Sequence, residues 1–315
     1  MEEALMRGYD VYAGVRSTSR RTYLTHKHIR FVELDFSSAE KLESKLLELQ
    51  NEAVSFDYII HSAGVTKAKS PDDFNTVNCG YTMNFAEALL RTRTVPRKFL
   101  YLSSLAAFGP ADGEGQISND SHPRPITSYG HSKWNAEKFL GSLRGFPHLI
   151  FRPSGVYGPR DTEFYFLYKL INMGIEPYLG SRSQQLSFIY VSDLTRVAMD
   201  ALESDRINKS YFISDGSDYT IQSFNETIKR QLNKKTVKLV LPSALMMPVA
   251  YTLERIASLF GTVATFNRER IREFEAANWR CNTDAIKEDL NFSARYTLER
   301  GMKESIDWYK QQGWL

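Results

Sequence analysis

Apolar residues in the first half of the chain alternate between short continuous runs and longer stretches with helical spacing. The continuous runs cover 11–15, 29–36, 56–64, 98–104 and 148–154. Runs of this kind are typical of parallel strands that are buried on both faces. Helical spacing predicts helices over 37–53, 72–93 and 128–144. This alternation predicts an α/β fold with a doubly wound, Rossmann-like parallel sheet.

The pattern loosens in the second half of the chain into loops and amphipathic helices. We therefore expect residues 1–155 to hold the sheet. Residues 156–315 would form mainly a smaller lobe over its carboxyl edge, where ligands bind in such folds, with some segments returning to the sheet. The most apolar stretch, 241–261, contains Pro248 and two charged residues, so we interpret it as a buried helical segment rather than a membrane element.

Composition narrows the class of protein. Of the 315 residues, 42% are hydrophobic and 24% are charged, which is ordinary for a globular protein. The net charge of +3 is too small to indicate a nucleic-acid partner. Cys79 and Cys281 lack the spacing of metal ligands or of a disulfide framework. We expect a cytoplasmic protein with a small-molecule substrate, no metal, and no nucleic-acid or membrane partner.

The sharpest chemical signal is Tyr129 followed four residues later by Lys133. Within a helix these residues share one face, and an ammonium beside a phenol should lower the pKa of the phenol. Ser104 stands at the end of an apolar run, where the carboxyl end of a buried strand faces the ligand crevice. The three side chains could then converge on one substrate oxygen, with Tyr129 as the general acid or base.

Six further segments occur in the order and spacing of a known family. They are FVELDF at 31–36, IHSAG at 60–64, VNCGYTMNFAEA at 77–88, FRPSGVYGPR at 151–160, FIYVSD at 188–193 and TLERGMKESIDWY at 297–309. With the Ser104, Tyr129 and Lys133 motifs, they make the chain resemble the extended short-chain dehydrogenases/reductases of the NAD-dependent epimerase/dehydratase family. The resemblance covers nearly the whole chain.

The resemblance implies a role for each matching residue. Residues 1–155 would bind NAD(P), Ser104 would hold the substrate oxygen, Tyr129 would exchange its proton, and Lys133 would tune Tyr129 and bind the cofactor ribose. The residues implied in cofactor binding are Arg16, Asp35, Phe36, Ser62, Ala63, Gly64, Asn78, Tyr129, Lys133, Ser154 and Val156.

Other polar residues allow two interpretations. His61 is either a satisfied polar residue at a strand end or part of a cofactor contact, and Asn78 either caps a helix or binds the cofactor. Asp193 is expected to cap the helix that follows it. Arg16 stands where an acidic residue would bind the ribose of NAD, so NADP is favoured and NAD remains possible.

The beginning of the chain departs from the family pattern. MEEALMRGYDV reads as the second half of a helix that ends at Gly8 and leads into a strand at Val11. The preceding strand and its GxxGxxG turn, which would hold the cofactor diphosphate, have no counterpart here. We expect either that the start was placed too far downstream, which we favour, or that a truncated protein binds its cofactor weakly.

The substrate is less defined by the sequence. Leu105 and Ala106 replace the Asp and Glu of the resembled sugar dehydratases, and Leu186 and Ser187 replace an Arg–Asp pair of many nucleotide-sugar epimerases; Arg182 nearby has the wrong spacing. These departures favour carbonyl/alcohol oxidoreduction of the dihydroflavonol-reductase or hydroxysteroid-dehydrogenase type. The alternatives are a nucleotide-sugar epimerase and a non-catalytic dinucleotide-binding protein. The helices at 72–93 and 128–145 are candidates for a homodimer interface.

Overall fold

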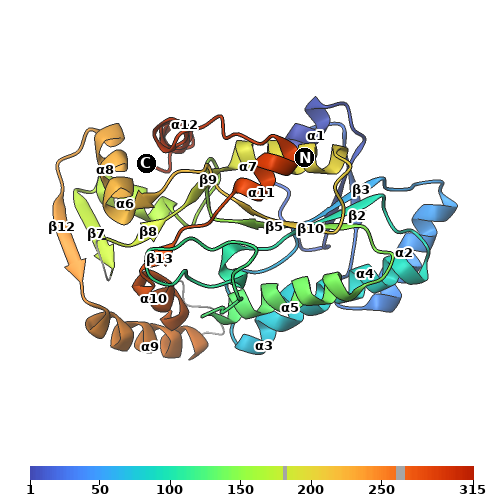
Figure 1. Ribbon diagram of the computed structural model, residues 1–315, viewed down its shortest axis with the longest axis horizontal. Coiled ribbons are helices and arrows are strands. Elements are labelled where there is room, and N and C mark those ends of the chain that lie inside the picture. The colour runs from blue at the N-terminus through green and yellow to red at the C-terminus, as the bar shows by residue number, and fades with distance from the viewer. Residues whose placement is uncertain (180–182, 260–266) are drawn as a thin grey trace.

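A parallel sheet with helices on both faces forms the centre of the computed structural model, which describes residues 1–179, 183–259 and 267–315 (Figure 1). Its four strands follow the order β10-β5-β4-β3, and each pairing is parallel. They are β3 (Tyr58–His61), β4 (Lys98–Leu102), β5 (His148–Pro153) and β10 (Lys209–Ile213). The predicted α/β fold is confirmed, and β10 is a later segment that returns to the sheet.

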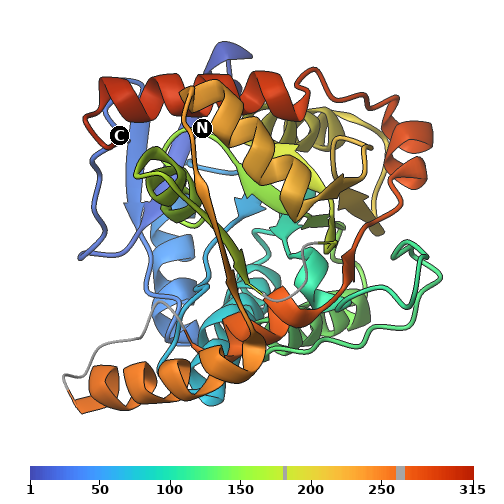
Figure 2. The ribbon, with the colours of Figure 1, turned by 90° about the vertical axis from the view of Figure 1, so that its left-hand side faces the viewer.

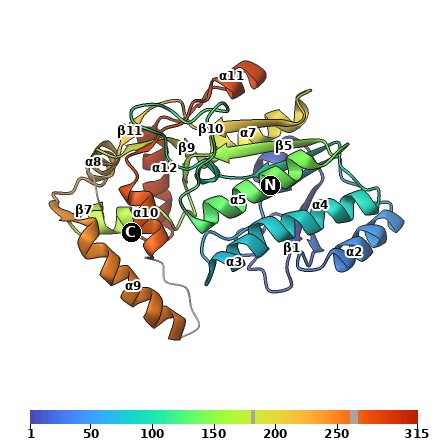
Figure 3. The same ribbon diagram turned by 60° about the horizontal axis from the view of Figure 1, so that its bottom comes forward.

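Helices cover both faces of this sheet, which explains why β4 and β5 are buried along almost their whole length. One face carries α2 (Ala39–Asn51), α4 (Tyr81–Arg91) and α5 (Ser128–Ser142), and the other carries α1 (Glu2–Met6), α7 (Val191–Glu203) and α11 (Asp284–Leu290) (Figures 1 and 3). The helix predicted over 72–93 is a composite of α3 (Pro71–Phe74), a π-helical segment η1 (Asn75–Gly80) and α4.

A second, two-stranded sheet lies beside the main one. It pairs β1 (Val11–Val15) with β2 (Ile29–Glu33) in parallel. Within the described residues, β1 and β3 each end their sheet, so the two sheets share no ladder. Ring contacts bridge the two sheets, Tyr9 with Tyr58 at 6.0 Å and Tyr12 with Phe56 at 5.3 Å between centroids.

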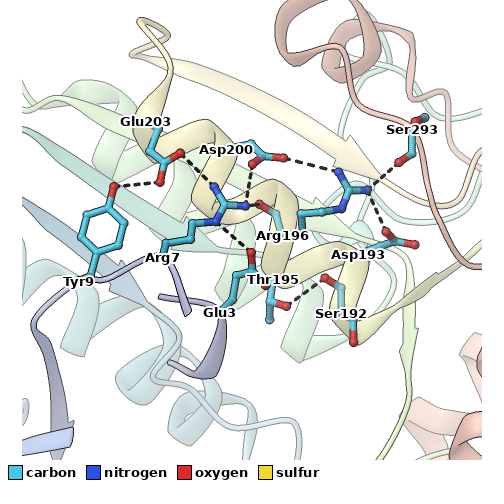
Figure 4. A network of polar contacts seen from close by, with 10 residues as sticks. All are labelled: Glu3, Arg7, Tyr9, Ser192, Asp193, Thr195, Arg196, Asp200, Glu203 and Ser293. Carbon is cyan, nitrogen blue, oxygen red and sulfur yellow. Dashed lines mark hydrogen bonds and ion pairs between the residues drawn. The ribbon is translucent and has the colours of Figure 1, made fainter. Parts of the chain in front are cut away.

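The first helix is held against α7 by ion pairs. α1 ends at Arg7, and Gly8 follows with φ +81°, a left-handed conformation that suits glycine after a helix, as predicted. The Arg7 guanidinium lies 2.7 Å from Asp200 and 3.0 Å from Glu203 of α7 (Figure 4). These contacts explain how a helix of five residues keeps its place on the sheet.

The remaining elements gather at one end of the molecule, on the left in Figure 1. Three small sheets pair β6 with β9, β8 with β11 and β13, and β7 with β12. Their strands are β6 (Gly155–Tyr157), β7 (Ile175–Leu179), β8 (Gln185–Leu186), β9 (Phe188–Tyr190), β11 (Tyr219–Thr220), β12 (Val237–Leu241) and β13 (Asn278–Trp279). The helices are α6 (Tyr165–Asn172), α8 (Ile221–Leu232), α9 (Ser243–Leu259), α10 (Arg268–Glu275) and α12 (Leu298–Gln311).

The apolar stretch at 241–261 forms α9 up to Leu259; Phe260 and Gly261 lie outside the described residues. Its expected burial is only partly right. Met246 and Ala250 are buried, but Tyr251 and Ile256 are about half exposed because α9 contacts the rest of the molecule along one side. None of the helices that the structure describes has the length and apolar character needed to cross a membrane.

Candidate active site

Ser104 and Tyr129 meet at the carboxyl end of β4. Ser104 follows this strand and begins the short helix η2 (Leu105–Ala107), whose Ala106 N–H donates to its hydroxyl at 3.2 Å. Tyr129 lies in the first turn of α5, which Thr127 caps by accepting from the Gly130 N–H at 3.1 Å. The Ser104 side chain lies close enough to the Tyr129 hydroxyl to lower its pKa. The structure therefore brings together the two groups that the sequence analysis placed on one substrate oxygen.

Lys133 lies one turn further along α5 and points to the sheet. Its Nζ donates to the Leu102 carbonyl at 2.9 Å and lies 4.8 Å from the centre of the Tyr101 ring. Burial lowers the pKa of Lys133 to about 8.

The pKa of Tyr129 is not lowered in the structure, although the sequence analysis expected Lys133 to lower it. Burial raises the pKa of Tyr129 to about 12, while the nearby Ser104 side chain lowers it and the charge of Glu273 raises it. The ammonium of Lys133 is directed to the Leu102 carbonyl at the end of β4, so burial dominates the pKa of Tyr129. The prediction that it lowers the pKa of Tyr129 is therefore wrong for this arrangement, and Tyr129 is a protonated phenol at neutral pH.

Asn78 ties the loop after β3 to α5. Its side-chain oxygen accepts from the Val65 N–H at 2.8 Å, and its amide donates to the Val65 carbonyl at 3.0 Å and to the Ser132 hydroxyl at 2.9 Å. It lies inside the π-helical segment η1 and caps no helix, which excludes one of its two interpretations. Such π segments are frequent at functional sites.

Gly64 allows this loop to approach Asn78 closely. A Cβ at Gly64 would lie 2.8 Å from Asn78 Oδ1, closer than real side chains come, and 3.3 Å from Lys133 Nζ, which is a tight contact. The neighbours Ser62 and Gly64 are exposed and Ala63 is half-buried, at the carboxyl end of β3. Of the three residues predicted from the IHSAG segment, Gly64 lies beside Lys133, and Ser62 and Gly64 are open to a ligand.

Ser154 has a buried hydroxyl whose hydrogen-bonding capacity is unused. It follows β5, its backbone N–H donates to Ile213 at 2.9 Å, and its Oγ has no partner among the described residues. A buried polar group without a partner costs about 1–3 kcal/mol, which a bound polar ligand would recover. Val156 is half-buried in β6. This orphaned hydroxyl fits a cofactor with a polar group at this edge.

Three more of the residues predicted to bind the cofactor follow β1 and β2. Arg16 is exposed after β1, with its backbone N–H bonded to Ser19 at 3.0 Å. Asp35 lies 2.8 Å from Lys41 and accepts from the Ser37 N–H, and these bonds, the Lys41 bond foremost, lower its pKa to about 2. Phe36 packs edge-on against Phe85. Asp35 thus also organises the start of α2.

His61 and Asp193 have structural roles. His61 is buried with Nε2 3.0 Å from Thr82 Oγ1, and burial lowers its pKa to about 3, so it is a neutral, satisfied core residue. Asp193 does not cap α7 as predicted; it accepts from the backbone N–H groups of Arg295 and Tyr296 at 2.9 Å each and pairs with Arg196 (Figure 4). It therefore fastens the segment before α12 to α7.

A cluster of charges beside Tyr129 was missed by the sequence analysis. Arg270 of α10 pairs with Glu273 at 3.1 Å and with Glu163, which also lies 3.4 Å from Lys67. The carboxylate of Glu269 accepts from the Ser128 N–H at 2.7 Å. The charges of Glu273, Arg270 and Glu163 all act on the pKa of Tyr129. No local motif marks this cluster, because its members come from three distant segments.

A buried ion pair holds α5 against the sheet. Glu137, one turn after Lys133, lies 2.7 Å from the guanidinium of Arg152 in β5 and also accepts from the Ser103 hydroxyl. Their side chains are only 1% and 6% exposed. The Arg152 guanidinium also lies 4.2 Å from the centre of the Phe108 ring. This cluster fixes α5, and with it Tyr129 and Lys133, against β4 and β5.

The residues present fit one half of a nicotinamide dinucleotide. Gly64, Asn78, Lys133 and Ser154 provide close backbone, amide, ammonium and hydroxyl groups around the Ser104–Tyr129 pair. The diphosphate half has no GxxGxxG turn in this sequence. Among the described residues, no group of three or more His, Cys, Asp and Glu side chains could hold a metal ion, and both cysteines are free and buried.

Comparisons with known proteins identify the family of this chain. The NAD dependent epimerase/dehydratase family matches residues 1–214. A ceramide reductase of Caulobacter vibrioides is 26% identical over 262 residues, covering 82% of this chain and 76% of that protein. An N-acetyl-alpha-D-glucosaminyl-diphospho-ditrans,octacis-undecaprenol 4-epimerase of Escherichia coli O157:H7 is 25% identical over 241 residues, covering 74% and 70%.

The fold of the whole chain is also found in solved structures. UDP-glucose 4-epimerase of Thermotoga maritima superposes with a TM-score of 0.79 at 17% identity, covering 99% of this chain and 94% of that one. Solved structures of the same fold include a UDP-glucuronic acid 4-epimerase from Bacillus cereus in complex with NAD, at a TM-score of 0.72 and 20% identity, covering 96% and 90%. From its site, its fold and the matching residues, this chain belongs to the NAD dependent epimerase/dehydratase family.

Proposed function

We propose that this protein is an NAD(P)-dependent oxidoreductase acting at a carbonyl/alcohol centre. The observation that carries the proposal is the proximity of the Ser104 and Tyr129 side chains at the carboxyl end of β4, where Ser104 acts on the pKa of Tyr129. A non-catalytic dinucleotide-binding protein would not need a proton-transferring phenol at this place. When bound, the nicotinamide supplies the hydride that a carbonyl carbon accepts or an alcohol carbon gives up.

Each residue has one task in this proposal. The Ser104 hydroxyl donates to the substrate oxygen and orients it, and the Tyr129 hydroxyl gives that oxygen a proton during reduction or takes it during oxidation. A pKa of about 12 keeps Tyr129 protonated at neutral pH, which suits the reducing direction. Lys133 holds the cofactor ribose.

The chemistry around Tyr129 favours an uncharged substrate over a nucleotide sugar. Arg270, the cation on the facing helix α10, is already held by two carboxylates, Glu163 and Glu273, so a diphosphate would have to displace them. Leu105 is buried where a dehydratase would need a carboxylate. Ser187, also buried, replaces half of the expected Arg–Asp pair, while Arg182 lies outside the described residues.

The names of two relatives also support an uncharged substrate. The ceramide reductase and a 3beta-hydroxysteroid-dehydrogenase/decarboxylase of Arabidopsis thaliana, 25% identical over 255 residues, are named for lipid molecules. We therefore propose a lipid-like ketone or alcohol as substrate. The second candidate is a nucleotide-sugar epimerase, which could use the same three catalytic residues. The Escherichia coli relative supports an epimerisation, although its name gives an undecaprenol-linked sugar diphosphate as the substrate.

NADP is the proposed cofactor, with NAD as the alternative. Arg16 after β1 is exposed, and a guanidinium suits the extra phosphate of NADP. Calorimetry with NADPH and NADH tests this, with Arg16→Ala as the variant and Arg20→Ala as the matched control. We expect Arg16→Ala to weaken NADPH binding at least tenfold and to spare NADH, whereas equal effects on both would favour NAD.

One experiment separates the two enzymatic functions. The protein is incubated with NADPH and long-chain aliphatic ketones or 3-ketosteroids, and separately with NAD and UDP-glucose. Reduction consumes one NADPH for each ketone, whereas epimerisation converts the sugar without net consumption of cofactor. We expect stoichiometric NADPH oxidation with a lipid ketone, while sugar conversion without it would establish the epimerase.

Two other expectations also remain proposals. A homodimer through α4 and α5 would appear as twice the monomer mass in light scattering. The division into a cofactor-binding part at 1–155 and a substrate-binding part at 156–315 would appear as protection of separate regions from hydrogen exchange by cofactor and by substrate.

A further inference from the structure

Exposed apolar side chains concentrate on β12 and α9. Of the seventeen large hydrophobic residues that are exposed in the described chain, eight lie between 237 and 259. They are Val237, Leu239, Val240, Val249, Tyr251, Leu253, Ile256 and Leu259, and we call them the β12–α9 surface. β12 leads directly into α9 along the outer end of the molecule (Figure 2). Scattered exposed hydrophobics are common, but a concentration of this kind marks an interaction site.

Unpaired positive charges lie within this surface and just before it. Lys234, Lys235, Lys238 and Arg255 are exposed, and none forms an ion pair with a carboxylate in the described part of the chain. The only acidic residue of α9, Glu254, is paired with Arg268 at 2.8 Å. A helix with apolar and aromatic side chains beside lysines and arginines is typical of proteins that lie on a membrane surface.

We propose that the β12–α9 surface docks on an anionic lipid bilayer. Charge decides between the possible occupants: a second copy of this chain would bring the same cations face to face across a two-fold axis, whereas anionic headgroups would neutralise them. The docking is peripheral, since no described helix could span a bilayer. It departs from the absence of a membrane partner expected from the sequence, because the exposure of α9 depends on tertiary packing.

The surface adjoins the candidate active site. α9 packs against α10, whose Glu269 accepts from the Ser128 N–H next to Tyr129 (Figure 3). Docking would therefore place the α10 side of the site close to the lipid. That a lipid-like substrate enters from there rests on the proposed function, but the docking itself does not require any catalytic activity.

Vesicle co-sedimentation tests the docking on the full chain. We expect at least tenfold stronger binding to vesicles containing phosphatidylserine than to phosphatidylcholine alone, and weaker binding at high salt. The variant Val249→Glu/Ile256→Glu should lose at least tenfold in binding. Met173→Glu, which changes a 66% exposed apolar residue outside the surface, is the matched control and should bind as the wild type.

A second variant keeps the test decisive if the α9 variant fails to fold. Lys234→Glu/Lys235→Glu changes only exposed side chains in the turn before β12 and should also reduce binding at least tenfold. Equal binding by this variant, or no binding of the wild type to anionic vesicles, would overturn the proposal. So would a wild-type dimer that Val249→Glu/Ile256→Glu converts to a monomer. None of these readouts involves turnover, so failure here is separate from failure of the proposed enzyme.

Discussion

Gly130 of α5 lies directly against the backbone of Ala106 in η2. A Cβ at Gly130 would lie 2.3 Å from the Ala106 carbonyl oxygen, a separation that no side chain tolerates. The absence of a side chain thus lets α5 approach η2 closely. Since Ser104 begins η2 and Tyr129 precedes Gly130, this approach determines how the hydroxyls of Ser104 and Tyr129 are placed relative to each other.

Gly130→Ala should therefore separate Ser104 from Tyr129. We expect the free energy of unfolding to fall by about 1–3 kcal/mol through overpacking, and turnover to fall with it. Gly141→Ala in the same helix is the matched control, since nothing lies within 4 Å of its added Cβ, and it should be neutral or stabilising by up to about 1 kcal/mol. Chemical denaturation measures both, and equal effects of the two variants would contradict the argument.

Asn78→Ala should weaken cofactor binding. The substitution leaves the Val65 N–H and carbonyl without their side-chain partner, which costs about 1–3 kcal/mol and loosens the loop beside Lys133. A loss of about tenfold in NADPH affinity is expected by calorimetry. Asn135→Ala, whose amide makes one exposed bond to Asn75 at 3.0 Å, is the control. If NADPH affinity is unchanged in Asn78→Ala, the loop does not contribute to binding.

The buried, neutral His61 should make the folded protein less stable in acid. Burial lowers its pKa from 6.5 to about 3, so between these values the unfolded chain holds one proton more than the folded chain. The contribution of neutral His61 to the free energy of unfolding is complete above pH 6.5. It is lost as the pH falls towards 3, at up to about 1.4 kcal/mol per pH unit. His61→Gln should reduce that slope, while the exposed His131→Gln should keep it. Denaturant unfolding across this range measures the slope, and an unchanged value in His61→Gln would refute the assignment.

Breaking the buried pair of Glu137 and Arg152 should be costly. Glu137→Gln leaves the Arg152 guanidinium buried without its carboxylate, at a cost of about 3–5 kcal/mol. Asp307→Asn breaks the exposed pair with Lys303 and should cost less than about 1 kcal/mol. Replacing both partners, as Glu137→Gln/Arg152→Met, should cost less than Glu137→Gln alone. A double variant that is the least stable of all would show that packing, not charge, dominates.

The sequence was sufficient for features that depend on local pattern. The apolar run at 98–104 and the helical spacing from 128 place Ser104 at a strand end and Tyr129 in a first helical turn, and these are the positions found. Gly8 likewise ends α1 with a left-handed backbone, as its position after the apolar residues of α1 predicts.

Features that depend on residues distant in the sequence could not be predicted from the sequence. Lys133 turns to the Leu102 carbonyl rather than to Tyr129, a choice between partners that helical spacing does not encode. Arg270 meets Glu163 across 107 residues of sequence. The apolar character of α9 indicates a helix but does not say which of its sides is covered, because that depends on α10 and the strands around it.

The most direct test of the central claim is a comparison of Tyr129→Phe with the wild type in NADPH-linked ketone reduction. Phenylalanine keeps the ring packed against Phe74 and removes only the proton that the substrate oxygen needs. We predict that turnover falls by about 10²–10⁴-fold while calorimetric binding of NADPH stays within a factor of two to three. Turnover by Tyr129→Phe at the wild-type rate would contradict the assignment of Tyr129 as the catalytic acid.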